Sequence, residues 1–121
     1  MYNIFIVEDH PVIRQSYALV LKRETDMTIC GEASSAEDAL AMIPGCAPDI
    51  VLIDVSLPKM SGLELVQRLQ EEQPGLPTVV ISGHREAVFI EGVLAAGAAH
   101  YIVKEQAAQQ LVAAIRQLVS K

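Results

Sequence analysis

Hydrophobic positions along this chain alternate between two spacings, one typical of buried strands and the other of amphipathic helices. Short and nearly continuous apolar runs, rich in β-branched residues, predict five strands at residues 3–8, 27–33, 49–54, 78–82 and 99–103. The strand at 49–54 is apolar on both faces and is therefore expected in the middle of a sheet. The strand at 27–33 is less apolar, which favours a place at the sheet edge.

Apolar residues at helical spacing lie between these strands and after the last one. Pro11 suits the first turn of the first helix, and Ser35 is a candidate N-cap for the second, which we expect Pro44-Gly45 to end. Ser61-Gly62 begins the third helix. The fourth is expected over 85–96, with Gly97 as its left-handed C-cap, and the fifth over 107–119.

Five strands separated by helices predict a parallel sheet with helices on both faces and right-handed crossovers. The chain has no internal repeat, low-complexity tract or linker, so we expect residues 1–121 to form a single three-layer α/β domain.

Composition and charge exclude several classes of partner. The formal net charge of -6 argues against direct contact with nucleic acid. No apolar stretch approaches the length of a membrane span, and the N-terminus has a strand pattern instead of a signal peptide, so we expect a cytoplasmic location and no membrane partner. Cys30 and Cys46 lack CxxC spacing, and we expect small, reduced, partly buried side chains there.

Charged and hydroxyl side chains follow the strands where each one ends. They are Glu8-Asp9, Asp54, Ser82 and Lys104. Ligands of open parallel sheets bind beyond the carboxyl ends of the strands. Two carboxylates about 4 Å apart repel by about 4 kcal/mol at an effective dielectric constant of 20, so this cluster favours a cation. Mg²⁺ prefers such oxygen ligands, and Asp54 is the candidate nucleophile for a phosphoryl group.

Four motifs carry a family resemblance: V-E-D-H-P at 7–11, I-D-V-S-L-P-K-M-S-G at 53–62, I-S-G at 81–83 and Y-I-V-K at 101–104. In this order, each at a strand end, they resemble the receiver domain of two-component response regulators over the whole chain. The His-Pro pair resembles the subgroup whose receivers carry a LuxR-type helix-turn-helix output domain. The resemblance implies a flavodoxin-like (βα)5 fold with strand order 2-1-3-4-5.

The resemblance also implies a role for each site residue. Asp54 would accept a phosphoryl group from the phosphohistidine of a histidine kinase or phosphotransfer protein. Asp9, Asp54 and the Ser56 backbone carbonyl would bind Mg²⁺ directly, and Glu8 would act mainly through water.

Three residues remain from the implied set. Lys104 would contact a phosphoryl oxygen, while Ser82 and Tyr101 would move together as a switch. The protein would then be a signalling receiver that assists its own aspartyl phosphorylation and dephosphorylation, not an enzyme in the ordinary sense. DNA would be reached only through an output domain outside this chain, in a longer regulator, and a homodimer is an expected assembly.

Two alternatives belong to other classes of protein. A receiver-like interaction module would keep the fold and act without phosphorylation. A phosphohydrolase with an Asp nucleophile would usually carry a second Asp at position 56, where this chain has Ser56. One departure from the family also stands out: many receivers have Pro after the lysine, with a cis peptide bond, and this chain has Glu105. The sequence leaves open whether the Lys104–Glu105 bond is cis or trans.

Overall fold

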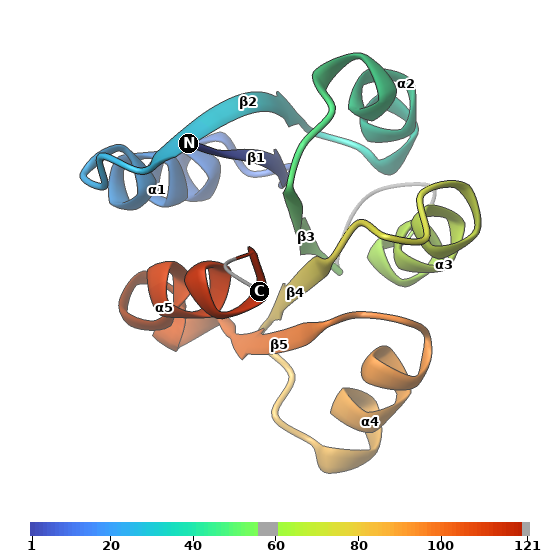
Figure 1. The fold of residues 1–121 in the computed structure, drawn as a ribbon. Coiled ribbons are helices and arrows are strands. Elements are labelled where there is room, and N and C mark those ends of the chain that lie inside the picture. The colour runs from blue at the N-terminus through green and yellow to red at the C-terminus, as the bar shows by residue number, and fades with distance from the viewer. Residues whose placement is uncertain (56–60, 120–121) are drawn as a thin grey trace.

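The computed structural model describes residues 1–55 and 61–119, and in these ranges strands and helices alternate along the chain (Figure 1). The strands are β1 (Tyr2–Val7), β2 (Met27–Ala33), β3 (Ile50–Asp54), β4 (Thr78–Ser82) and β5 (His100–Val103). The helices are α1 (Pro11–Lys22), α2 (Ala36–Cys46), α3 (Gly62–Glu72), α4 (Ala87–Ala95) and α5 (Ala107–Val119). A short 3₁₀ helix, η1 (Lys104–Gln106), joins β5 to α5.

All strand pairs are parallel, and their order in the sheet is β2-β1-β3-β4-β5. Helices α1 and α5 cover one face, and α2, α3 and α4 cover the other (Figure 1). The three-layer (βα)5 fold and the strand order are thus confirmed, as are the central place of β3 and the edge place of β2.

Side chains of the central strands alternate between two apolar clusters, as the two-residue period of a strand requires. Ile4 and Ile6 of β1 pack in the cluster shared with α1 and α5. Phe5 and Val7 pack in the cluster shared with α2 and α3. Packing on both faces fixes the backbone at the strand ends. The polar residues at those ends are therefore held in fixed positions.

The helix ends follow local sequence signals, with one exception. The Ser35 side chain accepts the Asp38 backbone N–H at 3.1 Å, and Gly97 has a φ of 122°, as predicted. The expectation that Pro44-Gly45 ends the second helix is wrong. Helix α2 includes Pro44 and runs to Cys46, and Ala47 takes the left-handed conformation with a φ of 49°. Proline near the end of a helix removes only one backbone bond of the last turn, so the helix continues past it.

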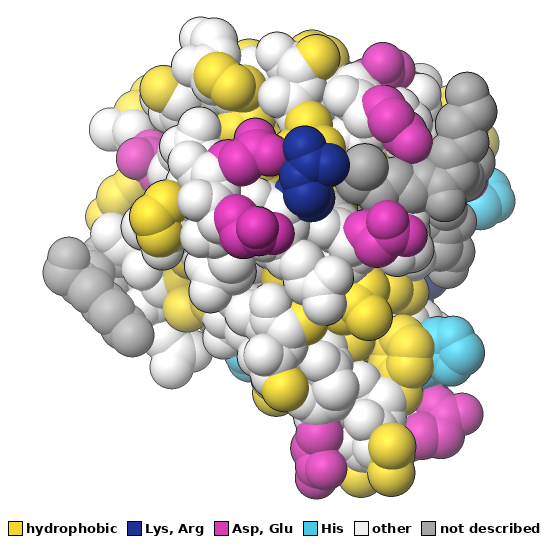
Figure 2. All heavy atoms as spheres, turned by 90° about the vertical axis from the view of Figure 1, so that its right-hand side faces the viewer, with side chains coloured by type: hydrophobic (Ala, Val, Ile, Leu, Met, Phe, Trp, Pro, Cys, Tyr) yellow, Lys and Arg dark blue, Asp and Glu magenta, His cyan; other side chains and the backbone are white. Residues whose placement is uncertain are grey.

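The outer surface agrees with the acidic composition. On the face that α2, α3 and α4 cover, acidic side chains are spread widely and basic ones are sparse (Figure 2). Of the helices that the structure describes, none combines the length and the apolar character needed to cross a bilayer.

Candidate functional site

The sheet brings the polar strand ends together at one edge. Glu8 directly follows β1, Asp54 ends β3 and Ser82 ends β4, while Lys104 directly follows β5. Val7 pairs with Ile53 across β1 and β3, so Glu8 and Asp54 leave neighbouring strands at the same level. The Glu8, Asp54 and Ser82 side chains are all buried. Carboxylates are seldom buried unless they serve a partner or a ligand.

Lys104 lies between the two buried carboxylates. Its Nζ is 3.5 Å from Asp54 Oδ2 and 3.7 Å from Glu8 Oε1. The Lys104 side chain remains 27% exposed, so its ammonium group also reaches solvent. A positive charge is thus already in place beside the Asp54 carboxylate.

The surroundings of the Glu8 carboxyl group disfavour its ionised form. Burial and the neighbouring Asp54 side chain raise its pKa from 4.5 to about 7, although the His10 backbone N–H and Lys104 act in the opposite direction. One ammonium group does not compensate two buried carboxylates in full. A further cation at this edge would favour the ionised form of both.

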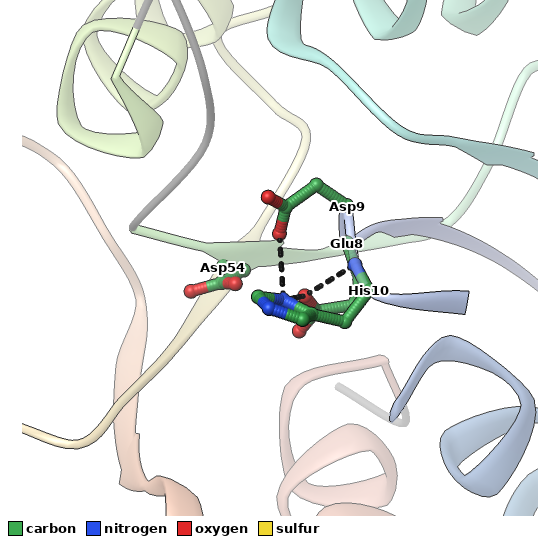
Figure 3. Close-up of side chains that lie close together, drawn as sticks. All are labelled: Glu8, Asp9, His10 and Asp54. Carbon is green, nitrogen blue, oxygen red and sulfur yellow. Dashed lines mark hydrogen bonds and ion pairs between the residues drawn. The ribbon is translucent and has the colours of Figure 1, made fainter. Parts of the chain in front are cut away.

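Four side chains could supply ligands to such a cation (Figure 3). Glu8, Asp9, His10 and Asp54 each place one ligand atom within 4.8 Å of the others. Three of the four offer carboxylate oxygens, which suit Mg²⁺. The other expected ligand, the backbone carbonyl of Ser56, lies outside the described residues. The structure brings together Glu8, Asp9 and Asp54, the acidic residues named from the sequence.

His10 lies at the rim of the acidic cluster and contacts two of its members. Its Nδ1 lies 3.1 Å from Asp9 Oδ1 and 3.4 Å from Glu8 Oε2, and its backbone N–H donates to Glu8 Oε2 at 3.1 Å. The ring itself is 62% exposed. His10 therefore sits at the rim and orients both acidic side chains.

Arg14 is a site residue that the sequence did not reveal. Its Nη1 donates to the backbone carbonyl of Glu8 at 2.7 Å, and its Nε lies 3.2 Å from Glu32 Oε1. The guanidinium group therefore ties the end of β1 to α1 and β2. Arginine on the first turns of a helix is common, so sequence position alone carries no signal for this role.

Ser82 and Tyr101, the two expected switch residues, converge on the backbone of His84. The His84 N–H donates to Ser82 Oγ at 3.2 Å, and Tyr101 Oη donates to the His84 carbonyl at 2.8 Å. The His84 ring packs against Phe89 with 4.3 Å between centroids, and Phe89 meets Tyr101 edge-on at 6.2 Å. The β4–α4 loop thus connects the hydroxyl at the site to the aromatic residue of β5.

Glu105 does not join the acidic cluster. Its Oε2 accepts a hydrogen bond from Arg85 Nη2 at 2.8 Å, and both side chains are exposed. No peptide bond within the described residues is cis, so the Lys104–Glu105 bond is trans. The departure from the Lys-Pro pattern therefore leads to a trans path and a surface ion pair with the β4–α4 loop.

Comparison with known proteins places this geometry in a family. The family model of the response regulator receiver domain matches residues 4–116. The transcriptional regulatory protein UhpA of Salmonella typhimurium is 33% identical over 115 residues, which are 95% of this chain and 57% of that protein. The response regulator GacA of Pseudomonas aeruginosa is 33% identical over 98% of this chain and 55% of that protein. The chain spans about half the length of the curated relatives it matches.

Solved structures agree with the fold. A LuxR-family two-component response regulator from Aurantimonas superposes with a TM-score of 0.93 at 27% identity, over 99% of this chain and 86% of that one. The response regulator domain of Thermotoga maritima CheB superposes with a TM-score of 0.91 at 20% identity, over 100% of this chain and 98% of that one. The second likeness bears on the fold alone.

Proposed function

The chain belongs to the response regulator receiver domain family, and we propose that it accepts a phosphoryl group on Asp54 from a phosphohistidine. The donor would be a sensor histidine kinase or a phosphotransfer protein. The observation that carries the proposal is the buried Asp54 carboxylate with Lys104 Nζ 3.5 Å from its Oδ2. Receivers are signalling modules, and this one would assist its own modification without turning over a separate substrate.

Asp54 has the chemistry of the acceptor. A carboxylate oxygen attacks phosphorus, the new O–P bond forms as the P–N bond breaks, and the imidazole leaves with the electron pair. Lys104 stands beside the attacking Asp54 carboxylate and would contact a phosphoryl oxygen as negative charge gathers there. Ser82 offers a hydroxyl to another of these oxygens.

The carboxylates of Glu8, Asp9 and Asp54 would hold Mg²⁺. The Ser56 carbonyl, which lies outside the described residues, stays a predicted ligand. When bound, the ion neutralises the acidic cluster and shields the charge on the phosphoryl oxygens. The raised pKa of Glu8 supports this assignment, because it shows that Lys104 alone does not balance the negative charge of the carboxylates.

The two contacts to the His84 backbone support a route for the signal. An aspartyl phosphate adds nearly two negative charges and strong acceptor oxygens. If Ser82 turns its hydroxyl toward the phosphoryl group, the loop that now donates to Ser82 Oγ must rearrange, and the Tyr101 contact to the same residue changes with it. Reversing a two-state equilibrium from 1:99 to 99:1 takes about 5.5 kcal/mol, of which these contacts would supply a part.

The larger protein is proposed from its relatives. Since UhpA is named as a transcriptional regulator and is nearly twice as long as the matched region, we propose that residues 1–121 form the receiver of a cytoplasmic transcription regulator. A helix-turn-helix output domain would then contact DNA, and the acidic receiver would not. The modified receiver would pair with a second copy.

Intact-mass spectrometry tests the acceptor. The chain is incubated with Mg²⁺ and a small phosphoramidate or acyl phosphate, and we expect a gain of one phosphoryl group that Asp54→Asn abolishes. Asp49→Asn is the matched control, since Asp49 lies at the opposite end of β3, where its carboxylate accepts the Asn3 N–H. An adduct that persists in Asp54→Asn would refute the assignment. A folded chain that gains no mass would favour the phosphorylation-independent interaction module.

A further inference from the structure

Two cysteines, far apart in the sequence, lie side by side at the face that α2 covers. Cys30 belongs to the edge strand β2, and Cys46 is the last residue of α2. Both are half-buried free thiols. Helix α2 starts beyond the carboxyl end of β2 and runs back along the sheet, so Cys46 lies toward the edge opposite the acidic site (Figure 1).

Cys30 lies at a β-bulge of β2 and faces the α2 side of the sheet. Ile4 pairs with Ile29 and the next residue, Phe5, pairs with Gly31, so Cys30 is the extra residue of β2. Ile29 packs against the cluster under α1 and α5, while Cys30 packs against the cluster under α2 that also receives Cys46. Ile29 and Cys30 thus face opposite sides as consecutive residues of a strand do, and the bulge sets both Cys30 and Gly31 against Phe5.

Gly31 makes room for the second thiol. A Cβ atom at this position would lie 3.0 Å from Cys46 Sγ and 2.7 Å from the Phe5 ring. Because Gly31 has no side chain, the Cys46 thiol rests on the Cys30–Gly31 peptide and donates to the Cys30 carbonyl at 3.4 Å. The Cys46 sulfur is therefore held within the reach of the Cys30 side chain.

The pKa of the Cys30 thiol also depends on the neighbouring Cys46 thiol. Burial raises the pKa of the Cys30 thiol from 9.0 to about 11, and the neighbouring Cys46 thiol adds to the rise. A thiol that stays protonated at neutral pH is a poor nucleophile. Cys30 is therefore given the role of the resolving group, which leaves the first oxidation to Cys46.

We propose that Cys30 and Cys46 form a reversible intramolecular disulfide when the protein meets a hydroperoxide, a modification site separate from the acidic cluster. The Cys46 thiolate attacks the outer oxygen of the hydroperoxide, so that an S–O bond forms and the O–O bond breaks. The leaving alkoxide takes up a proton as an alcohol, or as water when the oxidant is hydrogen peroxide. The Cys30 sulfur then attacks the Cys46 sulfenic acid. The S–S bond forms, the S–O bond breaks, and the hydroxyl group leaves as water with the Cys30 proton.

The expectation of reduced, partly buried thiols agrees with the structure, which adds that the two thiols are neighbours. In a reducing compartment such a bond is transient and acts as a redox signal. It would fasten the end of α2 to the edge strand β2.

Thiol counting on the whole chain tests the proposal. The reduced, desalted protein is treated with hydrogen peroxide, quenched with N-ethylmaleimide and weighed without reductant. We expect a monomer that has lost two hydrogen atoms and takes up no maleimide, and that regains both reactive thiols after dithiothreitol. A digest with a glutamyl endopeptidase, which cuts after Glu32 and Glu37, should join the peptides of Cys30 and Cys46.

Two variants complete the test. Cys46→Ser should lose the disulfide, and Cys30→Ser should lose it while leaving a Cys46 sulfenic acid that dimedone traps. Protein that keeps two maleimide adducts, gains only irreversible oxygen, or links two chains would overturn the proposal. None of these readouts depends on Asp54, so the result is independent of the phosphoryl-acceptor test.

Discussion

Lys104 Nζ lies 3.5 Å from Asp54 Oδ2, and the same ammonium group lies 3.7 Å from Glu8 Oε1. One positive charge from the end of β5 thus serves two buried carboxylates from the ends of β1 and β3. This arrangement makes Lys104 a stabilising residue of the unmodified protein as well as a proposed phosphoryl contact.

Replacing Lys104 by Met should therefore destabilise the fold. Removing one partner from a fully buried ion pair costs about 3–5 kcal/mol. Because the Lys104 side chain is 27% exposed, we expect a smaller loss of unfolding free energy, about 2 kcal/mol. Urea denaturation at neutral pH measures this loss of unfolding free energy.

Lys22→Met, at the exposed end of α1, is the control. The double variant Lys104→Met/Asp54→Asn should recover most of the loss. A Lys104→Met protein as stable as the parent would contradict this account.

Magnesium should stabilise the protein through the acidic cluster. A ligand that binds only the folded state adds about 2.7 kcal/mol to the unfolding free energy at a concentration one hundred times its dissociation constant. We expect thermal unfolding to shift upward with MgCl₂, compared with NaCl of equal ionic strength, and to return after chelation. Asp9→Asn should remove most of the shift, whereas Asp38→Asn on exposed α2 should keep it. Equal shifts in the two variants would argue against the proposed ligands.

A side chain at position 62, where Gly62 lies, should destabilise the protein. A Cβ atom there would lie 2.5 Å from the Asp54 carbonyl oxygen and 2.5 Å from Val55 Cα, both of them backbone atoms next to the acceptor. We expect Gly62→Ala to lower the unfolding free energy by about 1–3 kcal/mol through overpacking and to slow the phosphorylation of Asp54.

Gly92 provides the matched control. A Cβ atom at this position of α4 meets no described atom within 4 Å. Alanine in a helix interior is favoured over glycine by about 0.5–1 kcal/mol, so Gly92→Ala should stabilise the protein. Urea denaturation compares the two variants, and an equal effect of both would show that the close approach at Gly62 is unimportant.

The pair Asp26–Arg116 should show a defined pH dependence. Arg116 donates to both carboxylate oxygens of Asp26, at 3.1 and 3.0 Å, and these hydrogen bonds hold the pKa of Asp26 below its ordinary value of 3.8. A carboxyl group whose folded pKa is lowered stabilises the fold above its unfolded pKa, and that contribution is lost as the pH falls through the folded pKa. The parent should therefore exceed Asp26→Asn in stability at neutral pH, and the difference should shrink below about pH 4. Urea titrations at several pH values check this, and a difference that stays constant would rule the pair out as its source.

Much of the fold could be predicted from the sequence because buried segments have recognisable apolar patterns. Ile50 to Ile53 are apolar without interruption, and a strand with both faces buried needs nothing else to be recognised. Ser35 and Gly97 marked helix ends through backbone chemistry that acts over a few residues. The end of α2 was misplaced because the effect of Pro44 depends on how much helix remains after it.

The residues alone thus predicted the layered α/β fold and the strand ends that carry the polar groups. Family resemblance added the strand order, which the structure confirms, and the roles that we propose for the site residues. Tertiary structure decided which of these groups touch. Lys104 between Glu8 and Asp54, Ser82 and Tyr101 on His84, and Cys46 against Cys30 are contacts between residues distant in the chain. Such contacts depend on how separate segments pair, that is, on strand register and on the bulge at Cys30 that sets Gly31 opposite Phe5.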